Sequence, residues 1–246
     1  MLPLLAPNAA LFLDIDGTLI DFVPRPEDAC VPPTLLDTIA ALRRSLNGAL
    51  AVVSGRKLAD IDRLFSPLAL AAAGQHGAEA RLTASGKPQV FAAPQAALAS
   101  VSDRLAPFLA AHPRIRVERK GLSTAFHYRD AVEAGPALRA ELEQAVAPVA
   151  AALNLLDSHL CYDVRAHNAD KGKAVERFMA VAPFAGRVPV YVGDDWTDED
   201  GFKAVLAVQG RAVRVGASRE TLATERLSDP AALQQWLGQS LNALKA

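Results

Sequence analysis

Short, continuous apolar segments alternate with helical patterns in the first and last thirds of the chain. The strand-like segments are 10–15, 48–55, 68–74, 188–195 and 211–216, and the helical segments are 32–46, 57–65, 171–182, 197–208 and 229–244. Apolar runs this short, placed between helices, are typical of a parallel sheet that helices cover on both faces. We therefore predict an α/β fold with a Rossmann-like parallel sheet, in which a ligand would bind beyond the carboxyl ends of the strands.

The middle of the chain follows another pattern. Alternation of polar and apolar residues with period two, which is typical of half-exposed antiparallel strands, is combined there with helical segments. We predict that residues 78–165 form an inserted α+β cap domain, and that residues 1–77 and 166–246 together form the core. The segments concerned are the strands 79–90, 114–129 and 159–166 and the helices 93–111 and 135–153.

Composition restricts the possible partners. The 246 residues suffice for one large domain with an insert, and 51% hydrophobic residues allow a sizeable core. A formal net charge of -1 gives no overall attraction to nucleic acid or to an anionic membrane. Cys30 and Cys161 form no CxxC pair, and no apolar stretch approaches the ~20 residues of a transmembrane helix. We expect a soluble, cytoplasmic monomer without a secretion signal, which binds neither nucleic acid nor membrane.

Two aspartates follow the first strand-like segment, in the sequence LFLDIDGTLIDF (11–22). A polar turn would account for Asp16 and Gly17, but not for Asp14, which stands between two apolar residues. Spacing of two places both carboxylates on one side of the strand end, where they repel each other. A divalent cation would remove this repulsion and would bind well to oxygen ligands.

A second acidic cluster, VGDDWTDED (192–200), follows a strand-like segment near the end of the chain. A helix start with Thr197 as its N-cap would account for the later acidic residues. Asp194 and Asp195 precede this cap, and metal coordination is the most direct explanation for them. We expect Asp194 to be a metal ligand, with Asp195 and Asp198 in supporting positions.

Two further junctions offer donors to an anion. Lys171 follows Asp170 at the start of a helical segment, where the helix dipole favours anions, so a bound phosphate would suit it. A solvated lysine explains this position about equally well when it is considered alone. Ser54 and Gly55 end another strand-like segment and could offer a hydroxyl and main-chain amides, although a Ser-Gly turn is common. We expect all three to bind phosphate.

Together, these groups suit phosphoryl transfer, in which positioning and neutralisation of charge give most of the acceleration. Asp14 would attack phosphorus and form an aspartyl-phosphate. Asp16 would protonate the leaving oxygen and then accept a proton from the water that hydrolyses the intermediate. Mg²⁺, bound by Asp14, Asp194 and the main-chain carbonyl of Asp16, would neutralise the phosphate and the nucleophile.

The motifs DIDGT (14–18), SGR (54–56), DKG (170–172) and GDDWTDED (193–200) resemble, in order and spacing, the four motifs of the haloacid dehalogenase superfamily. Members of this superfamily include phosphatases that use an aspartate nucleophile. The resemblance implies a parallel α/β core, with a cap inserted between the second and third motifs.

Within that superfamily, the chain resembles the trehalose-6-phosphate phosphatases in GQHGAE (74–79), in VERKG and STAFHYR (within 117–129) and in YDVRAHNADKG (162–172). The resemblance implies hydrolysis of trehalose 6-phosphate to trehalose and phosphate. Ala166 stands where the family usually has proline, which puts the local loop in question but not the chemistry. The residues implied for binding the substrate are Arg56, His76, Glu118, Lys120, Arg129 and Asp163.

Other functions are compatible with parts of the pattern. A phosphatase for sucrose phosphate, mannosyl-3-phosphoglycerate or a hexose phosphate would share the core and differ in the cap. A sugar-phosphate mutase would move the phosphate instead of releasing it. A receiver domain phosphorylated on aspartate would need neither Asp16 nor a large insert. Neither a P-loop nor a GxGxxG motif supports nucleotide binding.

Overall fold

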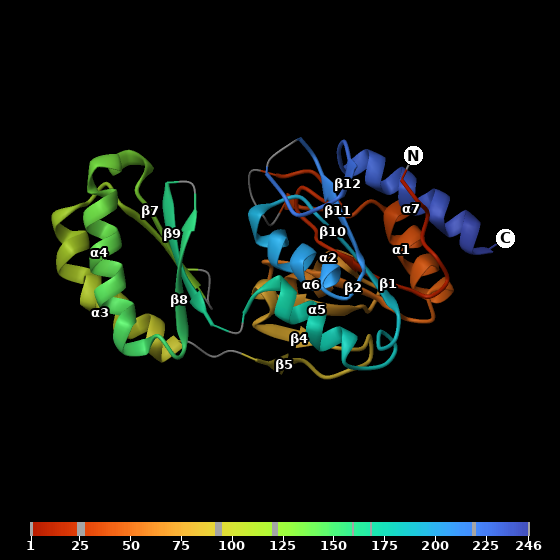
Figure 1. Cartoon of the computed structure of the whole chain (residues 1–246), viewed down its shortest axis with the longest axis horizontal. Coiled ribbons are helices and arrows are strands. Elements are labelled where there is room, and N and C mark those ends of the chain that lie inside the picture. Colours follow the sequence, from red (N-terminus) through yellow and green to blue (C-terminus); the bar gives the residue numbers. More distant parts are fainter. Residues whose placement is uncertain are drawn as a thin grey trace. The chain divides into compact units, whose positions relative to one another are not determined.

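The computed structural model describes residues 2–23, 28–91, 95–119, 123–158, 160–167, 169–217 and 220–245. The chain divides into two compact units, the first formed by Met1–Gln89 and Asp170–Ala246 and the second by Val90–Ala169. Figure 1 shows the elements of each unit, coloured along the sequence. Among the helices of the described residues, none has both the length and the apolar composition that a membrane crossing requires.

The first unit is built on an eight-stranded sheet with the order β12-β11-β10-β1-β2-β3-β4-β5. From β12 to β3 all neighbours are parallel, as predicted, whereas β4 runs antiparallel to β3. The strands are β1 (Ala9–Leu13), β2 (Leu50–Val53), β3 (Ala71–Gly74), β4 (Glu79–Arg81), β5 (Gln89–Val90), β10 (Val188–Gly193), β11 (Arg211–Val215) and β12 (Glu225–Leu227). The α-helices are α1 (Pro33–Ser45), α2 (Leu58–Phe65), α5 (Lys171–Met179), α6 (Glu199–Leu206) and α7 (Pro230–Lys245).

Helices cover both faces of this sheet, because its central strands carry apolar side chains on both sides. On one face, α1, α2 and α7 pack with Leu11 of β1 in one buried cluster. On the opposite face, the ring centroid of Phe12 lies 5.8 Å from that of Phe178 in α5. Tyr191 of β10 meets Phe202 of α6 edge-on, at 5.7 Å between centroids. Burial on both sides fixes the central strands, and with them the loops at their carboxyl ends.

Capping residues determine where two helices near those loops begin. Asp170 is the N-cap of α5, and its carboxylate accepts a hydrogen bond from the amide of Lys173 at 2.7 Å. The acidic segment after β10 forms a short 3-10 helix, η5 (Trp196–Asp198), which continues into α6. Its N-cap is Asp195 in a capping box with Asp198, so the predicted N-cap at Thr197 is wrong. The Asp198 carboxylate turns back onto the amides that precede it, and the helical turn therefore starts earlier.

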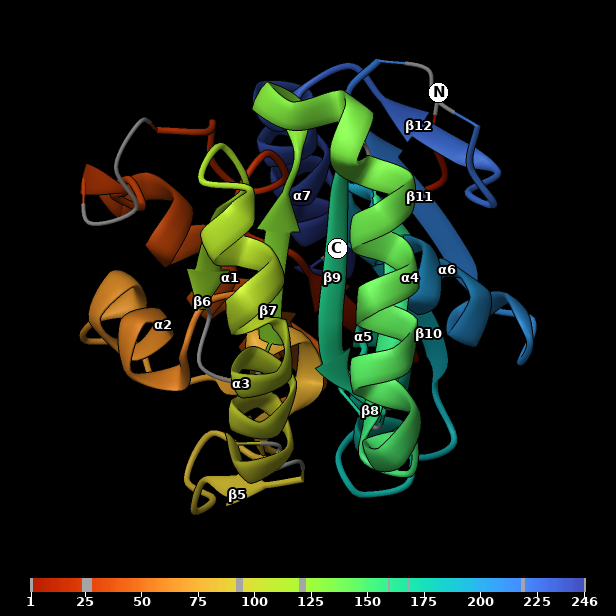
Figure 2. The same ribbon diagram turned by 90° about the vertical axis from the view of Figure 1, so that its left-hand side faces the viewer.

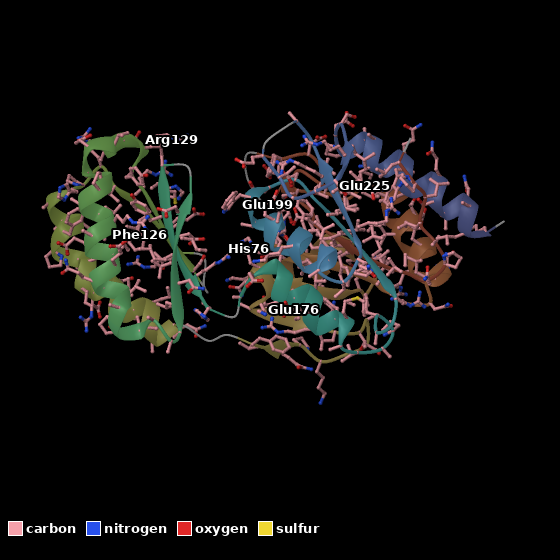
Figure 3. The ribbon with its side chains drawn as sticks, in the orientation of Figure 1. His76, Phe126, Arg129, Glu176, Glu199 and Glu225 are labelled. Carbon is pink, nitrogen blue, oxygen red and sulfur yellow. The ribbon has the colours of Figure 1, made fainter. Side chains whose placement is uncertain are left out.

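The second unit is an antiparallel sheet with the order β6-β7-β9-β8, packed against two helices. Figure 2 shows α3 and α4 side by side in front of β7 and β9. Phe126 is fully buried among the helix side chains of this unit (Figure 3). The strands are β6 (Arg116–Arg119), β7 (Ser123–His127), β8 (Leu153–Ser158) and β9 (Cys161–Ala166). The helices are α3 (Gln95–Ala111), η3 (Arg129–Ala134), α4 (Gly135–Val146) and η4 (Ala147–Val149).

The structure places the domain boundaries differently from the prediction. Residues 78–89 were expected in the cap but belong to the first unit, because β4 pairs with β3 in the larger sheet. The second unit ends at Ala169 instead of 165. The helix expected over 135–153 stops at Val146, and β8 follows it. Strands β8 and β12 were not predicted.

Candidate active site

The predicted site segments of the first unit lie at the carboxyl ends of neighbouring strands. Asp194 follows β10, Asp14 and Asp16 follow β1, and Ser54 follows β2, and these three strands are consecutive in the sheet. The amide of Asp14 still donates to the carbonyl of Val192 in β10 at 3.0 Å. The parallel sheet therefore brings together segments that are far apart in the sequence.

The turn after Asp14 depends on Gly17 and Thr18. Gly17 has a φ of +79°, and a Cβ atom there would lie 2.3 Å from Oδ2 of Asp194, so only glycine fits. The Thr18 hydroxyl donates to Oδ1 of Asp194 at 2.9 Å and lies 3.3 Å from Oδ2 of Asp14. Thr18 thus links the two acidic segments. Thr18 was not identified as a site residue from the sequence, although it belongs to the DIDGT motif.

Lys171 is buried and bridges two carboxylates. Its Nζ donates to Oδ1 of Asp14 at 2.8 Å and to Oδ1 of Asp198 at 2.7 Å. Burial lowers the pKa of the Lys171 ammonium, but the two carboxylates outweigh this effect and raise that pKa above its usual range. The lysine therefore stays charged inside the protein, and the alternative of a solvated lysine is wrong.

Asp198 anchors the acidic loop through both of its oxygens. Oδ1 accepts hydrogen bonds from Lys171 and from the Tyr191 hydroxyl, the latter at 2.8 Å. Oδ2 accepts from the amides of Asp194 at 3.1 Å and Asp195 at 2.9 Å. A fully buried carboxylate with this many donors holds its surroundings in place. Tyr191 was not identified from the sequence, where it is indistinguishable from the other apolar residues of its strand.

We expect Tyr191→Phe to lower the free energy of unfolding by about 1.5–3 kcal/mol, the range for a hydrogen bond to a charged group. The substitution leaves the ring in place, so the loss comes from the hydroxyl donor to Asp198 and not from a cavity. Urea denaturation measures the change. A difference below about 0.5 kcal/mol, which is typical of a surface substitution, would show that this hydroxyl does not stabilise the acidic loop.

The acidic cluster fits a divalent cation. One oxygen from each of Asp14, Asp194 and Asp198 lies within 4.8 Å of the others. Burial raises the pKa of Asp14, to which the charges of Asp198 and Asp194 add, and burial together with nearby carboxylates raises the pKa of Asp194 to about 6. A hard cation bound to oxygen would relieve this repulsion. Because Asp198 is occupied by protein donors, Asp14 and Asp194 are the carboxylates best able to bind it.

Asp16 is held by Arg56. The guanidinium donates from Nε to Oδ2 at 2.7 Å and from Nη2 to Oδ1 at 2.6 Å, which is the bidentate geometry that Arg and carboxylate favour. The amide of Arg56 also donates to Oγ of Ser54 at 3.2 Å. Arg56 therefore connects Ser54, which is expected to bind phosphate, to Asp16, the predicted acid–base residue. Arg56 was expected to bind substrate, and in this structure it contacts Asp16.

Arg214 of β11 holds the acidic loop from the other side. It is only 3% exposed, donates to the main-chain carbonyl of Asp194 and lies 3.6 Å from Glu199, which is labelled in Figure 3. Glu199 in turn accepts hydrogen bonds from the Thr221 hydroxyl at 2.6 Å and the Leu222 amide at 2.8 Å. Arg214 was not identified from the sequence; the signal was a charged residue between two valines of a strand.

In the second unit, the strand register gathers polar residues on the face opposite the helices. Glu118 and Asp163 both pair with Ala125, so the three lie in one row across β6, β7 and β9. Nε2 of His127 lies 3.0 Å from Oε2 of Glu118. A pocket of about 440 Å³ is lined by Arg116, Glu118, His127, Arg129, Asp130 and Leu160.

The residues expected to bind substrate are thus divided between the units. Glu118 and Arg129 line the same pocket, which only the second unit forms. Arg56 and His76 belong to the first unit. Lys120 lies outside the described residues.

The fold and the site together define a class of protein. A parallel sheet with a buried aspartate after a central strand, and an α+β unit inserted into the same chain, agree with what the resemblance to the haloacid dehalogenase superfamily implies. A solved phosphatase of this superfamily from Bacteroides thetaiotaomicron shares the fold with a TM-score of 0.63, at 19% identity over 95% of this chain and 94% of that chain.

The comparison with known families is more specific. A model of the family described as trehalose-phosphatase matches residues 12–234. A trehalose-6-phosphate phosphatase of Escherichia coli (strain K12) is 35% identical over 243 residues, covering 99% of this chain and 90% of the relative. The structure of Aspergillus fumigatus trehalose-6-phosphate phosphatase has the same fold, with a TM-score of 0.78 at 23% identity over 96% of this chain and 93% of that chain. The chain belongs to the trehalose-phosphatase family.

Proposed function

We propose that this protein hydrolyses trehalose 6-phosphate to trehalose and phosphate through an aspartyl-phosphate on Asp14. The observation that carries the proposal is the buried Asp14 carboxylate, which Lys171 contacts at 2.8 Å and which lies within 4.8 Å of an Asp194 oxygen. The family match and the name of the Escherichia coli relative support the choice of substrate.

The side chains of the first unit suit the two steps. Asp14 attacks phosphorus, the bond from phosphorus to the ester oxygen breaks, and Asp16 gives its proton to that oxygen. Asp16 then accepts a proton from water, whose oxygen attacks the phosphorus and releases phosphate from Asp14. Lys171 orients Asp14 and offsets the approaching negative charge. In the structure Arg56 donates to both oxygens of Asp16, so one of these contacts has to be released for Asp16 to carry and donate its proton.

We assign Mg²⁺ to the carboxylates of Asp14 and Asp194, with the main-chain carbonyl of Asp16 as a further expected ligand. Bound there, the cation would neutralise negative charge on the phosphate and the nucleophile. Ser54 and Gly55 are proposed to bind the phosphate oxygens through a hydroxyl and main-chain amides. Ser54 is only 1% exposed, so its hydroxyl is already in a fixed environment before a ligand arrives.

We propose that the second unit recognises the sugar through Glu118, Arg129 and Asp163, together with Lys120. Sugar hydroxyls require charged or polar donors and acceptors on one surface, and the row across β6, β7 and β9 supplies them. The pocket of about 440 Å³ lies within the range of small-molecule sites.

Glu118→Ala tests this assignment. We expect kcat/KM for trehalose 6-phosphate to fall about 10- to 100-fold, the loss of one hydrogen bond to a charged group, while hydrolysis of para-nitrophenyl phosphate is unchanged. Glu143→Ala is the matched control, because Glu143 is an exposed glutamate of α4 in the same unit that pairs with Arg139, and neither residue lines the pocket. Equal losses with both substrates would contradict a sugar-binding role for Glu118.

A phosphatase for another sugar phosphate is the second candidate, because its core would be the same. Phosphate release from trehalose 6-phosphate, sucrose phosphate, mannosyl-3-phosphoglycerate and glucose 6-phosphate separates the two. The largest kcat/KM is expected for trehalose 6-phosphate. A larger value for one of the other sugar phosphates would change the assigned substrate but would leave the proposed reaction mechanism as it is. Cytoplasmic location, a monomeric state and the absence of nucleic-acid partners stay predictions.

A further inference from the structure

The segment GQHGAE (74–79) connects β3 to β4 and takes no part in the steps above. Gln75, His76 and Gly77 have φ values of 50°, 57° and 95°, so three consecutive residues lie in the left-handed region. Residues other than glycine seldom adopt this conformation, and they keep it only where the surrounding structure enforces it. The turn is therefore held against its own local preference.

Main-chain hydrogen bonds attach this turn to the loop 54–56. The His76 amide donates to the carbonyl of Ser54 at 2.9 Å. The Gln75 amide donates to the carbonyl of Arg56 at 2.8 Å. These bonds hold the residues on both sides of Gly55.

Further contacts fix the turn itself. Oε1 of Glu79 accepts from Nε2 of Gln75 at 3.1 Å and from the amide of Leu58, the first residue of α2, at 2.8 Å. Arg177 of α5 donates to the carbonyl of Gly77 at 2.7 Å. Two helices that start next to the site therefore support the strained backbone.

The imidazole of His76 lies directly against Gly55. A Cβ atom on Gly55 would be 2.8 Å from both Cε1 and Nε2 of His76, and its nearest neighbours are all imidazole atoms. Gly55 is not among the glycines with positive φ, so the closeness of the imidazole, and not backbone conformation, is what a side chain at this position would disturb. The position of His76 in the first unit can be followed in Figure 3.

We propose that His76 is a positioning residue for the phosphate-binding loop. The strained turn holds the imidazole against Gly55, and this contact keeps the Ser54 hydroxyl and the loop amides in the conformation that receives phosphate. The inference rests on the proposed phosphatase function. It gives His76 a role in phosphate binding, in place of the contact with the disaccharide that the resemblance implies.

A double-mutant cycle tests the contact. His76→Asn removes the imidazole and keeps a residue that tolerates positive φ, whereas Gly55→Ala adds a methyl group where the imidazole lies. Inorganic phosphate is titrated calorimetrically into each variant in the presence of Mg²⁺. We expect His76→Asn to weaken phosphate binding about tenfold and Gly55→Ala at least as much. In the His76→Asn background, Gly55→Ala should cost at least about threefold less than in the wild type, because the collision is gone.

Inhibition by trehalose separates the two roles of His76. The inhibition constant of trehalose should be unchanged in His76→Asn. A loss of trehalose affinity equal to the loss of phosphate affinity would contradict the proposal. Additive losses in the cycle, or wild-type phosphate affinity in His76→Asn, would also overturn it. If His76→Asn does not fold, as thermal unfolding will show, His76→Gly replaces it, since glycine adopts this φ without strain.

A matched control and the substrate assay complete the design. Gln209→Asn alters another left-handed residue, exposed at the end of α6, and should leave phosphate affinity unchanged. Titration does not require turnover. A wild-type protein that binds phosphate but releases none from trehalose 6-phosphate would therefore reject the proposed substrate and leave the role of His76 to be decided by the cycle.

Discussion

Asp14→Asn is expected to abolish turnover without unfolding the protein. An amide cannot attack phosphorus, so kcat for trehalose 6-phosphate should fall at least about 10⁴-fold, as when other covalent nucleophiles are removed. In metal-free buffer, Tm should be unchanged or higher. Burial raises the pKa of Asp14, which means that its ionised form opposes folding at neutral pH, and Lys171 keeps its contact with Asp198 in the variant. Phosphate release and thermal unfolding measure both effects.

Asp37→Asn is the control for this substitution, because Asp37 is an exposed aspartate on α1, within the same unit. It should keep wild-type turnover and Tm. An Asp14→Asn protein that remains folded and turns over within about tenfold of the wild type would exclude Asp14 as the nucleophile.

Lys171→Met should be the most destabilising of the substitutions considered. It removes the cation between Asp14 and Asp198 and leaves both carboxylates buried, which typically costs about 3–5 kcal/mol of the free energy of unfolding. The loss relative to wild type should shrink as the pH falls. Burial raises the pKa of Asp14 and Lys171 partly offsets this, so without the lysine the pKa of Asp14 rises further, Asp14 takes up a proton on folding, and low pH favours the folded variant. Urea denaturation at several pH values measures this dependence, and turnover should be lost as well.

Lys173→Met provides the matched comparison. Lys173 lies on the same helix two residues later, but its ammonium group is exposed and forms a salt bridge with the exposed Glu176. We expect a change of at most about 0.5 kcal/mol, as for other surface ion pairs. Similar losses for the two lysines would mean that the buried ion pairs do not stabilise the fold.

Much of the first unit follows from the sequence because its signals are local. The apolar runs that became β1, β2 and β10 predict a parallel sheet, and parallel strands place their carboxyl ends at one edge. This rule was sufficient to expect Asp14 and Asp194 close together. Their link through Thr18 at 2.9 Å from Asp194 agrees with that expectation.

The errors in the predicted fold concern strands, because a local pattern indicates a strand but not the strand with which it pairs. Residues 79–81 have the alternation of an antiparallel strand, but alternation cannot tell which sheet they join, and they pair with β3. Strand β8 was also missed, because the predicted helix 135–153 overlaps only its first residue and its pairing with β9, which runs along its whole length, is not visible in a local pattern.

Tertiary contacts explain why two site residues were missed and why the partner of a third, Arg56, was not predicted. In the sequence, Tyr191 is one of several apolar residues of a buried strand. Only the structure shows that its hydroxyl donates to Asp198. Arg214 contacts the Asp194 carbonyl, and Arg56 contacts Asp16 across forty positions of sequence. The types of these residues are visible in the sequence, but the groups that they contact are defined only by the tertiary structure.

The proposed chemistry depends on Asp14 carrying the phosphoryl group between the two steps. Rapid mixing with trehalose 6-phosphate, acid quenching within one turnover and mass spectrometry of the digested protein would detect it. We predict that the peptide containing Asp14 gains the mass of one phosphoryl group, and that this species decays at the rate at which phosphate appears. Phosphate released with no modified peptide at any time, or with the group on a different residue, would contradict the mechanism.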